Sequence, residues 1–240
     1  MLGKTHVIGS LALMHIGLTA YTAYENRGGD VRMMLYHPDM NLEIMGFQFG
    51  RQLSLIEYSL VVMTVLLFIL WLLRIGGRRM LAGYFGAVVL GMSALFLAFD
   101  SIYPFQLTLI VLSFSFGTVL PDIDSEDSTI GKYIKPISRM IPHRTITHTL
   151  WAVLAIAGLA WSLESIYLFA LALGYVVHIA EDSFSEQGIR WFYPIPGFRS
   201  KRWRFPFAYE TGGVAESMML LLAIVTHTLC AGYVIWSNVG

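Results

Sequence analysis

The chain has 240 residues, of which 56% are hydrophobic and 13% are charged, and its formal net charge at pH 7 is +0. Soluble domains carry about 25% charged residues, so this composition argues against an ordinary water-soluble protein and makes a membrane location the first hypothesis. The single cysteine, Cys230, excludes a disulfide framework within the chain.

Seven apolar runs follow one another along the chain, and each predicts a helix. A transmembrane helix needs about 20 predominantly apolar residues, which the longer runs supply. In chain order the runs cover residues 5–24, 55–73, 81–99, 105–120, 146–163, 166–179 and 214–236. The first run lacks the basic flank and the cleavage site of a signal peptide, so we expect it to be retained. We therefore predict an all-α fold, a polytopic transmembrane helical bundle of about seven spans, in which residues 1–240 form a single transmembrane domain.

The basic residues indicate how such a bundle would be oriented. Of the 16 Lys and Arg residues, thirteen fall on the side that holds the N-terminus, and three fall on the other side. Basic residues in short loops concentrate on the cytoplasmic side of a membrane. We therefore predict a multi-pass membrane protein with the N-terminus in the cytoplasm and the C-terminus outside.

The same topology predicts that ionisable residues from distant segments meet at the cytoplasmic face. His178 and Asp182 are four residues apart and would share one face of a helix. Asp122 and Asp124 follow Pro121, which ends a helix and allows an extended segment to turn its carboxylates toward one ion. The predicted metal ligands are His6, Asp122, Asp124, His143, His148, His178 and Asp182, with Glu216 as an additional candidate.

Imidazole and carboxylate groups without a thiolate suit zinc, manganese or iron. Each pair alone has a simpler explanation, because two such side chains on a helix commonly form a hydrogen-bonded pair and an Asp after a helix is commonly a solvated cap. The convergence of three groups favours a site for one or two divalent ions, with zinc as the expected metal. His15, His37 and His227 do not converge with them, and we interpret these three as structural.

Several ordered sequence blocks resemble a known family. The blocks are Thr5-His6, Leu120-Pro-Asp-Ile-Asp124 followed by Ser128 and Gly131, His143-Arg-x-x-Thr-His148, Gly174-Tyr-x-x-His178-x-x-x-Asp182, Gly188-Ile-x-x-x-x-Pro194 and Thr211-Gly-Gly-x-x-Glu216. Their order and spacing resemble the YdjM-like family of LexA-regulated inner-membrane metal-dependent hydrolases. The Asp and His blocks are also similar to those of zinc-dependent phospholipases C. The resemblance covers roughly residues 1–15 and 105–220.

The resemblance implies a hydrolase bound to the cell inner (plasma) membrane, whose metal ligands are the seven residues given above. Two departures from the family pattern stand out. Ser125-Glu126 occupies the place where the family often has His-Pro, and Ser185-Glu186-Gln187 occupies the place of a Thr-Pro. One family ligand is therefore absent here, or Glu126 or Asp127 supplies it. Residues 53–101 are predicted to form a helical hairpin added to the family core.

Hydrolysis of a phosphoester in a lipid or amphiphilic substrate is the first functional hypothesis, because metal ions activate water and polarise phosphoryl oxygens. Arg144, next to His143, would bind the substrate phosphate, and Glu181 and Asp127 are alternative general bases. The expected partners are membrane lipids and the amphiphilic substrate, with no nucleic acid.

The basic segment 199–204 has two interpretations. Its arginines could bind substrate phosphate in bidentate fashion, with Trp203 at the membrane interface. The segment could instead hold topology charges that bind anionic lipid surfaces. The arginines concerned are Arg199, Arg202 and Arg204.

A membrane metal transporter or metal sensor without hydrolytic activity is the alternative function. Transport sites usually lie near the membrane midplane on interrupted helices. The candidate ligands here are predicted at one face instead, which favours the hydrolase.

Overall fold

The computed structural model describes residues 3–25, 42–49, 55–72, 74–99, 102–128, 130–206 and 208–239. The chain divides into two compact units, each assembled from separate stretches of sequence. The first unit contains residues 1–11 and 113–224, and the second contains residues 12–112 and 225–240. Three helices, α1 (Gly3–Glu25), α4 (Tyr103–Gly117) and α8 (Val214–Val239), have residues in both units.

The second unit contains a helical hairpin and a small β-hairpin. Helices α2 (Leu55–Leu72) and α3 (Arg78–Phe99) pack against each other, and the Thr64 hydroxyl lies 3.7 Å from the sulfur of Met92. Strands β1 (Leu42–Ile44) and β2 (Phe47–Phe49) pair antiparallel. The two residues between them, Met45 and Gly46, both have positive φ, as the two-residue turns of β-hairpins require. The apolar runs did not predict these two short strands.

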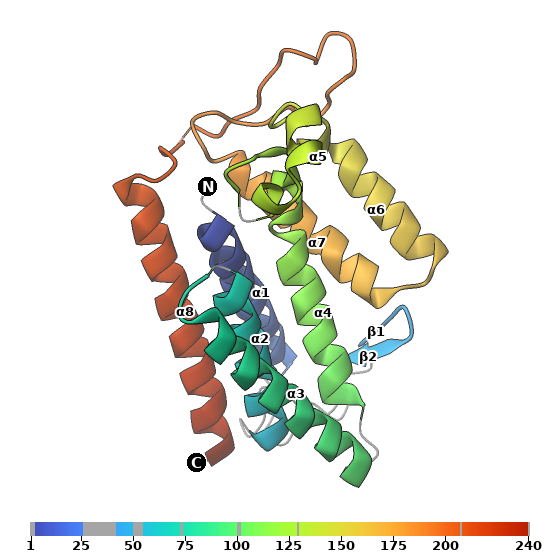
Figure 1. The fold of residues 1–240 in the computed structure, drawn as a ribbon, viewed down its shortest axis with the longest axis vertical. Helices are drawn as coiled ribbons and strands as arrows, with labels where there is room; N and C mark the ends of the chain where they lie inside the picture. Colours follow the sequence, from blue (N-terminus) through green and yellow to red (C-terminus); the bar gives the residue numbers. More distant parts are fainter. Residues whose placement is uncertain are drawn as a thin grey trace. The chain divides into compact units, whose positions relative to one another are not determined.

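The first unit holds the candidate site. The chain passes from α4 through the 3₁₀ helices η2 (Leu120–Asp124) and η3 (Gly131–Tyr133), helix α5 (Lys135–Met140) and the 3₁₀ helix η4 (Ile146–His148). It then forms the hairpin of α6 (Leu150–Ser162) and α7 (Ile166–Asp182), yellow and orange in Figure 1. Ser165 caps α7 by accepting a hydrogen bond from the backbone N–H of Leu168.

A small apolar core joins α6, α7 and the segment that follows α7. Its buried members are Val153, Tyr175, Ile179 and Ile189. Ile189 lies in the loop after α7, and its backbone exchanges hydrogen bonds of 3.0 and 2.8 Å with the backbone of Trp203. This packing fixes the C-terminal end of α7, which carries three of the candidate site residues.

The end of α4 crosses α7 at backbone contact distance. A Cβ on Gly174 would overlap the carbonyl oxygen of Phe114, and a Cβ on Gly117 would overlap that of Leu171. Only glycine permits such an approach, because any larger residue would push the helices apart. The crossing brings the residues just after α4 next to the last turns of α7.

The predicted transmembrane bundle is contradicted for the part of the chain that the structure describes. Helices lie where the apolar runs predicted them, yet none of those described combines the length and apolar character needed to cross a membrane. The runs 105–120 and 146–163 do not continue as α-helix, because the first gives way to η2 after Gly117 and the second begins as η4.

The lengths of the resulting helices make the same point. Helices α4, α6 and α7 have 15, 13 and 17 residues. At 1.5 Å per residue these lengths are about 20–26 Å, less than a hydrocarbon core of about 30 Å. The predicted orientation of the termini depended on the spans and stays a prediction, as does the assignment of residues 53–101 as an addition to the family core.

Candidate metal centre

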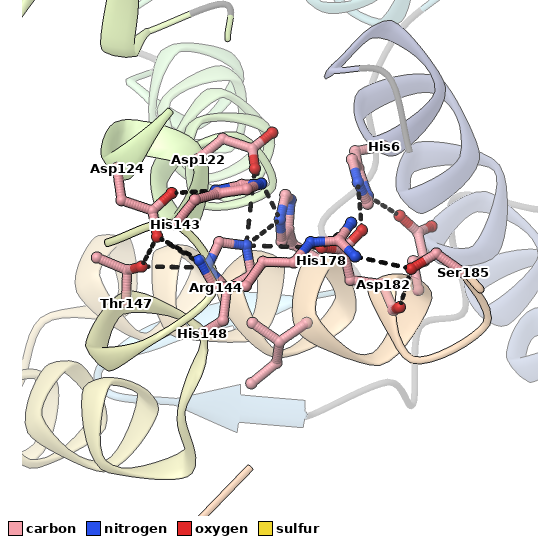
Figure 2. A network of polar contacts seen from close by, with 12 residues as sticks. His6, Asp122, Asp124, His143, Arg144, Thr147, His148, His178, Asp182 and Ser185 are labelled. Atoms are coloured by element: carbon pink, nitrogen blue, oxygen red, sulfur yellow. Dashed lines mark hydrogen bonds and ion pairs between the residues drawn. The ribbon is translucent and has the colours of Figure 1, made fainter. Parts of the chain in front are cut away.

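All seven predicted ligands lie together in the first unit, although they come from separate segments. His6 comes from α1, the two aspartates from η2, His143 from the turn before η4, His148 from η4, and His178 and Asp182 from α7. Figure 2 shows His148 and His178 with Asp122 and His143 on one side and His6 on the other. Most of these side chains are buried, with His148 and His178 0% exposed.

Three ligand atoms form a compact triangle at the centre of the cluster. His178 Nε2 lies 3.4 Å from His148 Nε2, and each of these nitrogens lies 3.6 Å from Asp122 Oδ1. Such distances are long for hydrogen bonds. They match the edges of a tetrahedral metal site, where bonds of about 2.0–2.2 Å separate the ligand atoms by about 3.3–3.6 Å. The triangle of Asp122, His148 and His178 therefore has the dimensions of three ligands around one ion.

Hydrogen bonds orient both central imidazoles with Nε2 toward the triangle. His178 Nδ1 lies 2.7 Å from the carbonyl oxygen of Thr118, which can only accept, so Nδ1 carries the proton. The Thr147 hydroxyl donates to Asp124 and therefore accepts from His148 Nδ1 at 3.1 Å. In their neutral forms both histidines thus direct the Nε2 lone pair inward, as metal-ligating histidines held by a second partner do.

A second group of candidate ligands adjoins the triangle on the side of α1. His6, His178 and Asp182 offer ligand atoms within 4.8 Å of one another. His6 Nδ1 donates to Glu181 Oε2 at 2.7 Å, while its Nε2 lies 3.3 Å from Asp182 Oδ1. Ser10 donates to the other oxygen of Glu181 at 3.2 Å. Glu181 thereby orients His6 toward Asp182, in the arrangement of a carboxylate–histidine–metal triad.

Asp124 organises the loop that precedes α6. Its carboxylate accepts hydrogen bonds from His143 Nδ1 at 2.7 Å, from the backbone N–H of Arg144 at 2.9 Å and from the Thr147 hydroxyl at 2.5 Å. Asp122, Asp124 and His143 also form a third group of ligand atoms within 4.8 Å of one another. Asp124 therefore holds the loop in place and also offers an oxygen to the cluster.

Arg144 enters the cluster from a strained backbone position. Its φ is 59°, a left-handed conformation that is uncommon for residues other than glycine and is concentrated at functional sites. Its guanidinium lies 2.8 Å from Asp182 Oδ2 and donates to the Ser185 hydroxyl at 3.0 Å. Ser185 in turn donates to the backbone oxygen of Asp182 at 2.7 Å. A cation is thus fixed beside the metal-ligand candidates.

The electrostatics of the cluster favour ionised carboxylates. Burial opposes ionisation of Asp122, yet the neighbouring His178 and His148 hold the pKa of its carboxyl at about 2. Burial likewise opposes ionisation of Asp124, but hydrogen bonds from His143 and His148 hold the pKa of that carboxyl below its usual range. For Asp182, the hydrogen bond from His6 outweighs burial and lowers the carboxyl pKa well below the usual range.

The pKa values of the three buried histidines shift in different directions. Burial lowers the pKa of His148, but the adjacent carboxylates of Asp122 and Asp124 outweigh it and raise the pKa to about 9. The pKa of His6 likewise rises to about 9, because hydrogen bonds to Asp182 and Glu181 outweigh burial. Burial and the neighbouring His6 lower the pKa of His178 to about 3. The buried carboxylates are anionic and hold protons on two histidines. Such a cluster is suited to bind a metal cation in place of these protons.

The donor set also fits the predicted metals. Nitrogen and carboxylate oxygen donors suit zinc, manganese or iron. His178 belongs to two of the three ligand groups, and Asp122 also belongs to two. A carboxylate such as that of Asp122 can bridge two neighbouring ions, whereas the single Nε2 lone pair of His178 can bind only one. The one-ion and the two-ion sites both stay predictions.

Other predicted residues lie outside this cluster. Asp127 and Glu126 lie in the exposed turn after η2, and Glu126 forms an ion pair with Arg139 at 3.1 Å. Glu216 is buried in the first turn of α8, where it accepts a hydrogen bond from the backbone N–H of Gly212 at 2.7 Å, as a helix cap does. The predicted arginines of the loop before α8 are exposed; they are Arg199, Arg202 and Arg204.

Two of the remaining histidines lie in the second unit. His15 and His227 have their Nδ1 atoms 3.3 Å apart, and their structural role stays a prediction. His37 lies outside the described residues.

Sequence reasoning assigned no role to three groups that orient the site: the Thr147 hydroxyl, the Ser185 hydroxyl and the Thr118 carbonyl. For Thr147 a signal existed, because this residue lies inside the block from His143 to His148. A backbone carbonyl such as that of Thr118 leaves no mark on a sequence.

Comparison with known proteins identifies a family whose profile covers most of the cluster residues. The profile of the family described as YdjM inner membrane protein matches residues 83–239 of this chain, a range that includes every cluster residue from Asp122 to Ser185. Inner membrane protein YdjM of Escherichia coli (strain K12) is 34% identical over 98 residues, which cover 36% of this chain and 47% of that protein. The protein of the same name from Shigella flexneri gives the same values.

A further relative is the uncharacterized protein YvsG of Bacillus subtilis (strain 168), which is 28% identical over 128 residues, covering 49% of this chain and 75% of that protein. The chain spans about half the length of the two YdjM proteins that it matches. No solved structure matches the chain. Because the family profile matches more than half of its residues, the chain belongs to the YdjM inner membrane protein family.

Proposed function

We propose that this protein is a metal-dependent hydrolase that cleaves a phosphoester in a lipid or amphiphilic substrate at the inner membrane. The observation that carries the proposal is the triangle of Asp122, His148 and His178, whose ligand atoms lie 3.4–3.6 Å apart. Two histidines and one carboxylate leave a fourth coordination position open, which distinguishes catalytic from structural zinc sites.

Zinc is the metal we propose, with manganese and iron as alternatives. Asp122, His148 and His178 would hold it, and His6 and Asp182 would be ligands of a second ion. When bound, the metal supplies Lewis acidity: it lowers the pKa of water toward 7 and polarises a phosphoryl oxygen. The hydrogen bonds from His178 to Thr118 and from His148 to Thr147 keep the ligand nitrogens in position for this role.

Arg144 is the proposed substrate-binding cation. Its guanidinium is 10% exposed and lies 2.8 Å from Asp182, so its charge is held at the edge of the ligand cluster. A planar guanidinium matches the geometry of phosphate oxygens and would bind the charge that develops on them. The left-handed backbone at Arg144 supports this assignment, since strain of this kind persists where function requires a fixed geometry.

Glu181 is the proposed general base in preference to Asp127. Its carboxylate is 12% exposed, contacts His6 at 2.7 Å and lies beside the ligand Asp182. Asp127, the alternative, is exposed in the turn after η2. A general base has to lie within hydrogen-bond reach of the proton that it takes, which favours a residue inside the cluster.

The membrane location rests on the family and on the surface of the protein. Large apolar side chains of α6 and its following turn are exposed, including Trp161 at 79%, Leu163 at 62% and Leu154 at 50%. Several exposed apolar side chains on one helix favour contact with lipid or with another protein.

A comparison of two matched variants tests the proposal. Asp122→Asn neutralises a carboxylate of the triangle, and Asp127→Asn neutralises an exposed carboxylate of the same segment. We expect the first variant to lose metal and to stop releasing phosphorylated headgroups from an inner-membrane lipid extract, while the second matches the wild type in both measurements. If the zinc-loaded wild-type protein cleaves no phosphoester in that extract, the hydrolase proposal is wrong and the metal sensor or transporter takes its place.

A further inference from the structure

The loop between α7 and α8 concentrates positive charge and exposed rings. We use the name basic loop for residues 190–206. Its cations are Arg190, Arg199, Lys201, Arg202 and Arg204. From Gln187 to Tyr209 the sequence contains no aspartate or glutamate, so this charge is not neutralised within the loop. The exposed apolar side chains are Ile195 at 36%, Phe198 at 40%, Trp203 at 40% and Phe205 at 48%.

Backbone hydrogen bonds tie the basic loop to the end of α7. The N–H of Phe205 donates to the carbonyl of Ser183 at 2.9 Å, and Ile189 exchanges two bonds with Trp203. The side chain of Arg202 donates to the carbonyl of Gln187 at 3.2 Å. The ring of Phe205 also stacks on that of Phe184 with centroids 4.2 Å apart. The exposed cations and rings are therefore presented on a folded surface.

Cations of the loop lie over its aromatic rings. Lys201 Nζ is 4.5 Å from the ring centroid of Trp203 and 5.9 Å from that of Phe198. The guanidinium of Arg199 lies 5.8 Å from the ring of Tyr193. Charged heads and aromatic rings thus occupy the same surface. A partner that suits it must offer negative charge and an apolar layer side by side.

We propose that the basic loop is a docking surface for the anionic phospholipid headgroups of a bilayer. Lysine and arginine side chains are attracted to anionic lipid headgroups, while tryptophan and other aromatic rings settle at the level of the headgroups. Exposed aliphatic and aromatic side chains such as Ile195 and Phe198 would be covered by lipid. A nucleic acid would satisfy the charge but would leave Ile195 in water.

The position of the basic loop links this surface to the candidate metal centre. The loop is bonded to Ser183, and two residues later Ser185 accepts a hydrogen bond from Arg144. The basic loop and the candidate metal centre both belong to the first unit. A membrane surface bound by the loop would therefore lie close to the site. The docking surface does not depend on the proposed hydrolase activity.

Tryptophan quenching in mixed micelles tests the docking surface. The full-length protein is titrated in neutral detergent with phosphatidylglycerol or phosphatidylcholine brominated near the headgroup, and the Trp203 signal is isolated by subtracting that of W203F. We expect half-maximal quenching at about a tenfold lower mole fraction of phosphatidylglycerol than of phosphatidylcholine, from the attraction of several cations. We expect this preference to disappear at about 1 M salt, where the Debye length is about 3 Å.

Two charge variants separate a local surface from general charge attraction. The variant R199Q/K201Q/R202Q should lose the preference for phosphatidylglycerol, while K132Q/K135Q/R139Q, which removes the same charge near α5, should keep it. Equal quenching by the two lipids in the wild type would overturn the proposal. An equal loss of the phosphatidylglycerol preference in both variants would also overturn the proposal. Displacement of the lipid by a single-stranded oligonucleotide at low concentration would do the same.

Discussion

At the scale of single residues, the candidate site depends on which nitrogen of each histidine faces inward. His178 and His148 both use Nδ1 for a protein hydrogen bond and direct Nε2 toward Asp122. The Thr147 hydroxyl and the Thr118 carbonyl determine which nitrogen of each histidine faces inward, although neither group would bind the metal itself. Mutation of groups that orient ligands in this way typically lowers metal affinity or activity by about 10–100-fold.

Removal of the Thr147 hydroxyl should therefore weaken metal binding. In Thr147→Val the His148 ring loses its Nδ1 partner and Asp124 loses a donor. We expect metal affinity to fall by about 10–100-fold, measured by competition with a chelator of known affinity. Thr149→Val is the control, because the Thr149 hydroxyl donates to the carbonyl of Ile146 and not to a residue of the ligand cluster. Equal affinities in the two variants would contradict the orienting role.

Removal of the Arg144 side chain should separate metal binding from turnover. Arg144 lies beside Asp182 and outside the triangle of ligands, so Arg144→Ala should retain metal. We expect kcat to fall by about 10²–10³-fold, as for the loss of one donor to a developing oxyanion. Arg139→Ala, at an exposed ion pair with Glu126, should leave kcat unchanged. An Arg144→Ala protein that turns over substrate at the wild-type rate would remove Arg144 from the proposed mechanism.

At the scale of elements, the crossing of α4 and α7 determines where His178 lies. The carbonyl of Thr118 reaches His178 only because Gly117 and Gly174 let the two helix backbones touch. The 3₁₀ helix η2 then follows directly and carries both aspartates to the same place. The site thus depends on close packing between elements that are distant in sequence.

An alanine at this crossing should be destabilising. In Gly174→Ala the new Cβ would overlap the carbonyl oxygen of Phe114, and such overpacking typically costs about 1–3 kcal/mol. Gly158→Ala in α6 is the matched control, because a Cβ there meets nothing within 4 Å. The control should gain up to about 1 kcal/mol from higher helix propensity. Denaturant unfolding measures both changes, and a Gly174→Ala protein as stable as the control would show that the helices separate easily.

At the scale of the whole molecule, the first unit draws on distant parts of the chain. It combines residues 1–11 with residues 113–224, and His6 meets Glu181 across 175 residues of sequence. A metal ion shared by His6, His178 and Asp182 would connect α1 to α7. Binding to the folded state alone stabilises a protein by about 2.7 kcal/mol at a ligand concentration 100 times the Kd.

Chelation should therefore lower the thermal stability of the protein. We expect a chelator to lower the midpoint of thermal unfolding of the wild type, because the carboxylates of the cluster lose the cation that they surround. The same chelator should have no effect on His178→Ala, which lacks a residue shared by two ligand groups. A wild-type midpoint that does not respond to complete removal of metal would argue against a metal that joins these segments.

The sequence by itself determined where the long helices lie and which histidines and aspartates form the candidate ligand cluster. Apolar runs mark helices because buried or lipid-facing segments share this composition, and the ligand residues stand out because they are ionisable residues at the ends of such runs. The ordered blocks around Asp122, His143 and His178 also indicated the family. The composition did not show that α4, α6 and α7 are too short to cross a membrane, since an apolar run does not reveal where an α-helix gives way to a 3₁₀ helix.

Only the tertiary structure decided how these residues meet. It brought Glu181 to His6 and left Asp127 in an exposed turn, although both are acidic residues close to predicted ligands. It also showed that Thr118 orients His178 through a backbone carbonyl. The physical reason is that such contacts depend on how closely two helices approach, and this distance follows from packing between segments far apart in the chain.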